Sequence, residues 1–482
     1  MEKLMASDWS VCEECKGLGK KNRVIKNTAK KRHHTLLNTT ETAEVNPPKF
    51  HLENCLACAG KGIIPTAKAT EADTQHYPHV AIIGGGIGGV ALAVACLHRG
   101  IPFTLYERDN SFDARSQGYG LTLQQASKAL SGLGILTLND GIVSTKHVVH
   151  NTEGKVLGEW GMRKWIETNP NVIPRKSHIH NIHIARQALR KALINQLGQH
   201  ANIKWGHQLT AIKNTTQNKV ELSFTVNEIT KHETADLVVG ADGIRSTLRK
   251  LTIGEERSPL NYLGCIVILG ICNLSDLQHI QSSLLDSATV FQTANGHERI
   301  YMMPYDAHSI MWQLSFPLTE AESKELSSQG AASLKKEACR RTQWHKPIPD
   351  ILAATQEAQI SGYPVYDREL LQTSLLKNVG PITLIGDAAH PMSPFKGQGA
   401  NQALLDALAL ARAIAINCKP SNEWRDLGLR KQILFEFEEN MMTRSAVKVN
   451  ESRAAAQFLH SDIVLQEGNI TRGGCAKNTM LP

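Results

Sequence analysis

The chain's longest apolar run, VAIIGGGIGGVALAVACL, extends from Val80 to Leu97 and contains no charged residue. Its first part is short and β-branched, which is typical of a strand buried on both faces. Its last part continues into VALAVACLHRG, a helix pattern that ends at Gly100. Although the run is near the length of a membrane helix, such a helix has no use for the glycine-rich GGGIGG at its centre. The pattern therefore predicts a buried strand, a tight turn and a helix, with no membrane span.

The glycines of this turn follow the spacing G-x-G-x-x-G at Gly84, Gly86 and Gly89. In a strand–turn–helix unit the first glycine makes the turn, the second admits a pyrophosphate, and the third lets helix and strand pack closely. The next buried strand, IPFTLYERD, brings Glu107 about twenty residues further on, where an acid accepts hydrogen bonds from an adenosine ribose. The unit predicts a dinucleotide site, and its acid argues against NADP in that site.

A second buried strand, ITLIG, ends at Gly386 and Asp387. A loop containing proline and glycine follows, and an Ala/Leu-rich helix begins near Gly399. Gly397 and Gly399 leave backbone N–H groups uncovered where the helix dipole is positive, which favours a developing anion.

The segment between these motifs reads as strands separated by short polar breaks, for example YLGCIVILGI, RIYMMPY and SIMWQLSF. It predicts a mostly antiparallel sheet, which we assign to a substrate domain over residues 251–365. Because neighbouring strand residues point to opposite faces, either Tyr301 and Met303 or Ile300 and Met302 face the ligand. The sequence leaves this choice open.

Together these motifs resemble the class A flavin monooxygenases of the para-hydroxybenzoate hydroxylase type. The glycine fingerprint with Glu107 is the first match. LVVGADGIRSTLR matches the family's DG motif at Asp242-Gly243, and LIGDAAHPMSPFKGQGANQALLDA matches its GD motif at Gly386-Asp387. IARQALRKAL adds a fourth match at Arg186-Gln187.

The resemblance implies roles for individual residues. Glu107 would hold the adenosine ribose of FAD and Asp387 the ribityl chain. The catalytic positions would be Pro394, Gly397 and Gln398, in the loop beside the flavin. The implied cofactor-binding residues are Gly84, Gly86, Gly89, Glu107, Arg108, Arg186, Gln187, Asp242, Gly243, Gly386, Asp387, Gly399, Ala400 and Asn401.

The resemblance also implies an α/β fold: a Rossmann-like FAD-binding domain with an inserted, mostly antiparallel substrate sheet. NAD(P)H would reduce FAD, and a flavin C4a-hydroperoxide formed with O2 would hydroxylate an aromatic or polycyclic small molecule. No deprotonating base for a phenol is evident in the sequence, so the substrate and the choice between NADH and NADPH stay open. A flavin halogenase is an alternative enzyme, but its W-x-W-x-I motif is absent.

Two N-terminal stretches, CEECKGLG and CLACAGKG, share the pattern C-x-x-C-x-G-x-G. Each tight turn offers two thiolates, and a tetrahedral structural zinc site needs four. We therefore predict a Zn²⁺ site at Cys12, Cys15, Cys55 and Cys58. The motif resembles the cysteine-rich domain of DnaJ-type chaperones, which has four copies, so it supports a zinc turn and not chaperone activity. A redox-active C-x-x-C pair is the rival interpretation, but it does not explain the glycines.

Composition adds limits to the function. The net charge of +8 comes partly from a basic cluster, residues 16–34, which is either a solvated segment or a contact for a polyanion. Elsewhere acids and bases are interspersed, so we do not expect a nucleic-acid partner. The start, MEKLMASDWSVCEEC, lacks the order of a signal peptide, and we expect a cytoplasmic protein without a disulfide framework.

We expect five segments along the chain. The zinc module is interpreted as an accessory docking or stabilising unit, with a protein partner as one role for it. The alternative function is a flavin-binding scaffold that recruits its partner through this module. The segments are 1–76 (zinc module and linker), 77–250 (FAD-binding domain, first part), 251–365 (substrate domain), 366–465 (FAD-binding domain, second part, and C-terminal helices) and 466–482 (disordered tail).

Overall fold

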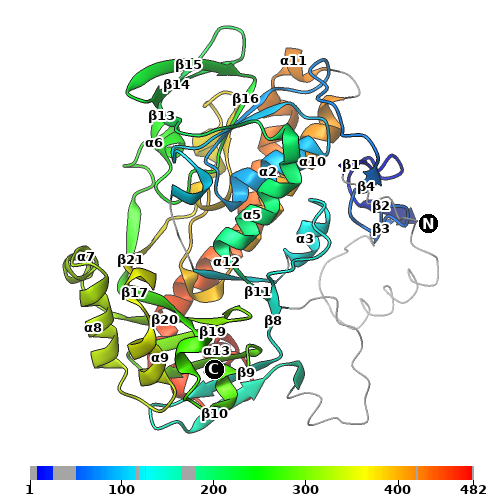
Figure 1. Ribbon diagram of the computed structural model, residues 1–482. Coiled ribbons are helices and arrows are strands. Elements are labelled where there is room, and N and C mark those ends of the chain that lie inside the picture. Colours follow the sequence, from blue (N-terminus) through cyan, green and yellow to red (C-terminus); the bar gives the residue numbers. More distant parts are fainter. Residues whose placement is uncertain are drawn as a thin grey trace, which may run out of the picture.

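The computed structural model describes residues 8–24, 50–114, 119–124, 126–163, 181–419 and 422–479. Figure 1 shows a small N-terminal module at the side of the molecule beside helix α10 (Gly399–Cys418), a central region, and a large sheet at the bottom of the view. Residues 25–34 of the basic cluster lie outside the described part of the chain.

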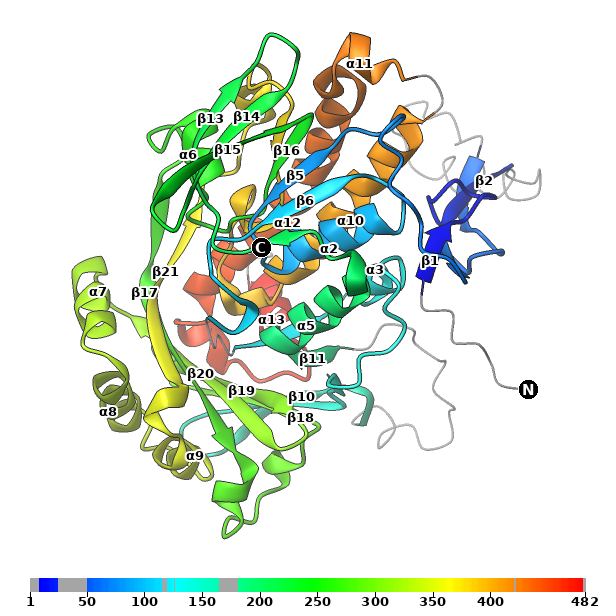
Figure 2. The same cartoon turned by 45° about the horizontal axis from the view of Figure 1, so that its top comes forward.

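Parallel strands form the central sheet in the order β12-β6-β5-β16-β22. The apolar run of the sequence becomes strand β5, a glycine loop and helix α2 (Ile87–Leu97), as predicted. Helices α2, α5 (Arg186–Leu197) and α10 lie side by side against the sheet (Figure 2). None of the helices in the described ranges has the length and apolar character needed to cross a membrane. The strands are β5 (Val80–Ile83), β6 (Phe103–Tyr106), β12 (Ile203–Lys204), β16 (Leu237–Gly240) and β22 (Ile382–Leu384).

A small antiparallel sheet connects β12 to β16. Its middle strand, β14, alternates buried and half-buried residues, which matches the period of a strand with one face on the core. The strands are β13 (Gln208–Asn214), β14 (Val220–Val226) and β15 (Ile229–Ala235). The short helix α6 (Thr247–Ile253) follows β16.

The large sheet has the order β10-β9-β18-β19-β20-β17-β21, and all of its neighbours are antiparallel except β9 and β18. Helices α7 (Glu320–Ser328), α8 (Ala331–Arg341) and α9 (Ile348–Ala354) cover one face (Figure 1). The strands are β9 (Lys146–His150), β10 (Val156–Trp160), β17 (Leu260–Asn273), β18 (Thr289–Ala294), β19 (Arg299–Asp306), β20 (Ser309–Pro317) and β21 (Ile360–Arg368).

This sheet is not contained in residues 251–365, where the sequence placed the substrate domain. Strands β9 and β10 come from the preceding segment and extend the sheet beyond β18. Their contact depends on a parallel pairing between residues more than 140 positions apart, Lys146 and Thr289 being one pair. A local hydrophobic pattern carries no information about such a pairing.

A third sheet has the order β7-β11-β8; its strands β8 and β11 contact β19 of the large sheet, and β7 contacts α10. Its strands are β7 (Gly120–Leu123), β8 (Ile142–Val143) and β11 (Ile182–Ala185). Helix α3 (Ser127–Ser131) follows β7 and packs near α10. Strand β11 runs directly into α5, so the N-terminus of that helix begins next to this sheet.

The C-terminal part consists of α11 (Trp424–Leu427), α12 (Phe435–Phe458) and α13 (Arg472–Thr479). Residues from 466 onward were predicted to be disordered, but α13 forms there and buries Cys475 and Ala476. The Arg472 guanidinium donates to backbone carbonyls of the preceding loop, including that of Gly468 at 2.7 Å. Small buried residues and backbone contacts give little hydrophobic signal, which explains the difference.

The N-terminal module consists of two short ribbons. Strand β1 (Asp8–Val11) pairs with β4 (Ile63–Thr66), and β2 (Lys20–Val24) pairs with β3 (Phe50–Asn54). Thr70 donates to the backbone oxygen of Trp9 at 2.8 Å, and Asp73 donates through its backbone to Gly100 at 2.8 Å. The module and its linker are therefore attached to the rest of the described chain.

Candidate active site and metal centre

A cavity of about 960 Å³ opens between the carboxyl ends of the central strands and the large sheet. Ligands of open α/β sheets bind at this edge. The predicted residues on its wall are Gly86, Arg186, Gly243, Gly386, Asp387, Pro394, Gly397, Gln398, Gly399 and Ala400. The predicted residues that lie off the wall are Gly84, Gly89, Glu107, Arg108, Gln187, Asp242 and Asn401.

The three fingerprint glycines have different surroundings. Gly84 adopts a left-handed φ of +106°, which side chains rarely adopt. A Cβ on Gly89 would lie 1.9 Å from the carbonyl oxygen of Gly84, so helix and strand approach closely there. A Cβ on Gly86 would meet no atom nearer than 3.8 Å, and this glycine faces the cavity. These are the surroundings that the motif requires.

Glu107 is held by backbone amides at the end of β6. Its Oε2 accepts from Gly85 at 2.7 Å, and its Oε1 accepts from Asp109 at 3.0 Å. Arg190, which the sequence did not single out, donates through Nε to the carbonyl oxygen of Gly85 at 2.7 Å. Arg108 is exposed. The Glu107 carboxylate thus holds the backbone of the glycine loop at Gly85.

The two residues of the DG motif have different surroundings. Asp242 accepts from the Ser246 hydroxyl and from the Leu248 amide at 3.1 Å, so its carboxylate fixes the start of α6. Burial raises the pKa of Asp242, against the lowering effect of the Ser246 hydrogen bond. Gly243 has a φ of +82°, and a Cβ there would meet nothing within 4 Å. The Asp242 carboxylate thus accepts hydrogen bonds from the start of α6, whereas Gly243 leaves room on the cavity wall.

The GD motif follows β22, and both of its residues line the cavity. A Cβ on Gly399 would lie 3.4 Å from Oδ1 of Asp387, so the carboxylate lies beside the first turn of α10. Burial raises the pKa of Asp387, while the positive charges of His390 and Arg186 act to lower it. Arg186 lies 5.5 Å above the ring of Tyr119. The carboxylate and the guanidinium thus flank the same part of the wall.

The loop before α10 is fastened by Asn401. Its Oδ1 accepts from the Gln124 amide at 2.8 Å, and its Nδ2 donates to the carbonyl oxygens of Thr122 and Gly397 at 2.8 Å each. Gly397 has a left-handed φ of +59°. Asn401 therefore supports the loop with its whole side chain, and the wall itself is formed by neighbours such as Gln398.

The alternation along β19 is resolved by the structure. Tyr301 and Met303 line the cavity. Ile300 and Met302 are 0% exposed and pack in the core beneath the helices α7–α9. Trp312 belongs to that same core and donates through Nε1 to Thr355 at 2.9 Å.

The large sheet carries a buried cation that the sequence motifs did not predict. Arg299 is 5% exposed, lines the cavity, and donates through Nε to Oε1 of Gln292 at 2.8 Å. Its guanidinium lies 4.9 Å from the ring centre of Tyr301, and burial lowers its pKa to about 10. No ion pair of Arg299 is found among the described residues. The pairing of β18 with β19 sets Arg299 opposite Ala294 and diagonal to Gln292, and the sequence carries no signal for this pairing.

Two histidines on the cavity wall were also missed. Burial lowers the pKa of His183 to about 3 and that of His147 to about 4, so both rings are neutral at neutral pH. Nδ1 of His183 lies 3.0 Å from the Thr122 hydroxyl, and its Nε2 has no hydrogen-bond partner among the residues that the structure describes. His183 thus offers one free ring nitrogen at the cavity.

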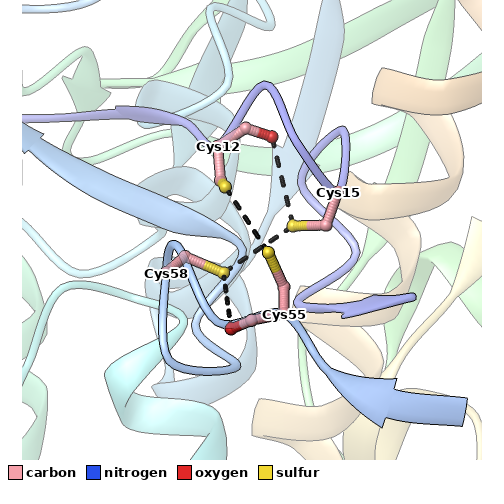
Figure 3. A group of neighbouring side chains, drawn as sticks. All are labelled: Cys12, Cys15, Cys55 and Cys58. Carbon is pink, nitrogen blue, oxygen red and sulfur yellow. Dashed lines mark hydrogen bonds between the residues drawn. The ribbon is translucent and has the colours of Figure 1, made fainter.

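The four N-terminal cysteines meet in one cluster (Figure 3). Their sulfur atoms all lie within 4.8 Å of one another, with Cys12 to Cys55 at 3.9 Å and Cys15 to Cys58 at 3.7 Å. Four ligands at the Zn–S length of about 2.3 Å in a tetrahedron are roughly 3.8 Å apart. The spacing therefore fits a tetrahedral metal.

The backbone supports these sulfurs in the same way in both turns. The Gly19 amide donates to the sulfur of Cys15 at 3.2 Å, and the Gly62 amide donates to the sulfur of Cys58 at 3.2 Å. A Cβ on Gly19 would lie 2.2 Å from the Gly60 oxygen. The repeated glycines are thus explained by the close approach of the two turns.

A profile of the FAD binding domain family matches residues 77–424. A probable FAD-dependent monooxygenase of Arthroderma benhamiae is 24% identical over 416 residues, covering 80% of this chain and 93% of that protein. The 3-amino-4-hydroxybenzoate 2-monooxygenase PtnB3 of Streptomyces platensis is 26% identical over 341 residues, covering 70% of this chain and 80% of that protein.

Among solved structures, Klebsiella pneumoniae HpxO complexed with FAD and uric acid is similar to this chain with a TM-score of 0.64. The two are 20% identical, and the match covers 83% of this chain and 92% of that chain. At this identity the likeness establishes a shared fold.

Proposed function

The chain belongs to the FAD binding domain family, and from this premise we propose that it is a monooxygenase that uses FAD, NAD(P)H and O2 to hydroxylate an aromatic or polycyclic small molecule. The family and the α/β FAD-binding fold expected from the sequence are confirmed. The observation that carries the proposal is the shared cavity, in which the glycine, DG and GD motifs face a sheet of aromatic and methionine side chains. The similar monooxygenase that acts on an aminohydroxybenzoate supports an aromatic substrate.

The residues on the wall fit FAD. Gly86 and Gly243 leave the backbone open to a ligand, since added Cβ atoms would meet nothing nearer than 3.8 Å. Gly86 is the N-cap of α2, so that helix presents its positive end to the phosphates. Asp387 would accept from a ribityl hydroxyl, and the N-terminus of α10 would stabilise negative charge on the reduced ring. Bound FAD supplies the redox and oxygen chemistry, which the protein directs by position and by excluding water.

The opposite wall would hold the substrate. Tyr301 and Met303 offer an apolar surface, and Arg299 offers a cation with no carboxylate partner in the described residues. A buried cation of this kind favours an oxyanion such as a carboxylate or phenolate. His183 would exchange a hydrogen bond with a substrate hydroxyl through its free nitrogen. We therefore expect an aromatic substrate that carries an acidic oxygen.

The absorbance spectrum of the purified chain, with the released cofactor identified by mass, tests the FAD site. We expect a flavin spectrum and FAD in near-equal amount. Next, NAD(P)H consumption and oxygen incorporation from ¹⁸O2 are measured with paired aromatic compounds, one carrying a carboxylate or phenol and the other its neutral ester or ether. A protein that takes up no FAD would contradict the proposal. FAD binding with slow NAD(P)H turnover for every compound would instead favour the scaffold alternative, which nothing in the described residues supports.

We further propose that Cys12, Cys15, Cys55 and Cys58 hold a structural Zn²⁺ ion. Four thiolates leave no position open for water or substrate, so the metal would stabilise the module and take no part in oxygenation. The metal content of the purified chain, with Co²⁺ exchange as a spectroscopic probe, tests this site. We expect about one zinc per chain and a tetrahedral thiolate–cobalt spectrum. If a Cys15→Ser, Cys58→Ser double variant kept both the bound metal and the cobalt spectrum, these cysteines would be excluded as ligands.

A further inference from the structure

Two arginines of the FAD-binding region lie against the cysteine cluster. Arg99 follows helix α2 directly, and Arg412 lies on α10. A Cβ on Gly17 would lie 3.9 Å from Nε of Arg99, and one on Gly19 would lie 3.2 Å from Nη2 of Arg412. Arg412 also donates through Nη2 to the carbonyl oxygen of Lys61 at 3.1 Å. Between them the two guanidinium groups reach both cysteine turns.

Neither arginine has a carboxylate partner among the described residues. Arg99 is 2% exposed, donates to the Ala95 oxygen at 3.0 Å, and leaves Nε and Nη2 without a hydrogen-bond partner. Nε of Arg412 is also buried without a partner. Unpaired buried cations are strongly unfavourable, so the site needs a negative group.

The two cations also act on each other. Burial, followed by repulsion from Arg412, lowers the pKa of Arg99 to about 9. Burial lowers the pKa of Arg412, and the groups that oppose this are the thiols of Cys15 and Cys58. Both guanidinium groups lie beside the cysteine turns, so a negative charge formed on the four sulfur atoms would lie close to both cations.

A metal centre supplies it with matching charge. Protonated thiols are neutral, but four thiolates around a divalent ion carry a net charge of −2, equal and opposite to the two guanidinium groups. We propose that Arg99 and Arg412 are the counter-charges of a dianionic metal–tetrathiolate centre, so that metal loading docks the N-terminal module onto the FAD-binding region. This inference rests on the zinc site proposed above. By linkage, the arginines must strengthen metal binding as much as the metal stabilises the docked module.

Chelator competition on full-length protein tests this. Zn²⁺ affinity is measured for the wild type, Arg99→Met, Arg412→Met and the charge-conserving Arg412→Lys. Arg257→Met is the matched control, because Arg257 is exposed and has no ion pair among the described residues. We expect the Zn²⁺ dissociation constant to rise about tenfold or more in each Met variant, to change much less in Arg412→Lys, and to be unchanged in the control.

The metal-free state gives a second readout that a merely structural role would not move. Removing an uncompensated cation should leave the melting temperature of the metal-free Met variants equal to or above that of the metal-free wild type, while the rise on adding Zn²⁺ becomes smaller. The inference would be overturned if the Met variants lost the same stability with and without metal, or if both kept the Zn²⁺ affinity of the wild type. Either result would leave the proposed zinc site intact. A chain that takes up no metal would overturn both.

Discussion

Among single residues, Arg299 is expected to decide which substrates bind. Replacing it with glutamine keeps a polar group beside Gln292 but removes the cation from the cavity wall. Hydrogen bonds to charged groups are worth about 1.5–3 kcal/mol, so we expect Arg299→Gln to raise KM about tenfold or more for an acidic aromatic substrate. The conservative Arg299→Lys should restore much of the loss. Steady-state kinetics with the acid and its neutral ester check this; an equal rise in KM for both compounds would exclude charge recognition.

His390 has a structural role that depends on pH. Its Nε2 lies 2.7 Å from Oδ2 of Asp406, which also accepts from the Gly386 amide at 2.9 Å. Burial disfavours the imidazolium, but the charge of Asp406 outweighs it, and the pKa of His390 is raised above its ordinary value. The pair therefore supports the GD loop most when His390 is protonated.

This predicts the sign of a stability change. A raised pKa in the folded state gives stability that is complete below the ordinary pKa of about 6.5 and is lost as the pH rises through the folded value. His390→Gln should lower the free energy of unfolding by about 1–3 kcal/mol at pH 6, with a smaller deficit at pH 9. Denaturant unfolding at both pH values measures this. A deficit that grows with pH would mean that the buried ring is neutral.

The elements of the active region divide into those that the sequence specifies locally and those that it does not. Two units are contiguous in the chain: β5 with the glycine turn and α2, and β22 with its loop and α10. In both units the residue propensities, the glycines and the apolar runs indicate the same structure. Residues such as Asp242 and Asn401 stand in these motifs, yet their side chains bond to the protein itself. A motif indicates which loop surrounds a ligand, whereas which side chain touches it depends on distant strands.

Two adjacent residues of β19 test which side chains face the cavity. Met302 and Met303 are adjacent, but Met302 packs in the core under α7–α9, whereas Met303 lines the cavity. Met302→Ala should lower the free energy of unfolding by about 2–5 kcal/mol with kcat/KM nearly unchanged below the melting temperature. Met303→Ala should lose less stability, because the cavity already borders it, and should shift KM in favour of bulkier substrates. Unfolding and kinetics of both variants check this; reversed effects would mean that β19 has the opposite register.

For the whole molecule, long-range pairing is what the sequence could not supply. Composition and motifs predict one α/β body with an inserted sheet, but β9 and β10 join that sheet from the first part of the chain. The cysteine repeat predicts its own cluster, yet Arg99 and Arg412 approach it only because α2 and α10 lie side by side. The N-terminal ends of both helices lie at the cavity, through Gly86 and Gly399. The cysteine cluster thus lies near the C-terminal parts of the two helices, whereas the cavity lies at their N-terminal ends.

Metal removal should therefore change cofactor retention more than catalysis. Stripping Zn²⁺ from full-length protein with a chelator is expected to lower the melting temperature by about 5 °C or more, since binding at 1,000 times Kd is worth about 4 kcal/mol. FAD should be released at a correspondingly lower temperature, which flavin fluorescence during heating records. At 25 °C kcat/KM should stay within about twofold, because none of the four cysteines lies on the cavity wall. A large fall in kcat/KM with FAD still bound would instead make the module part of the active site.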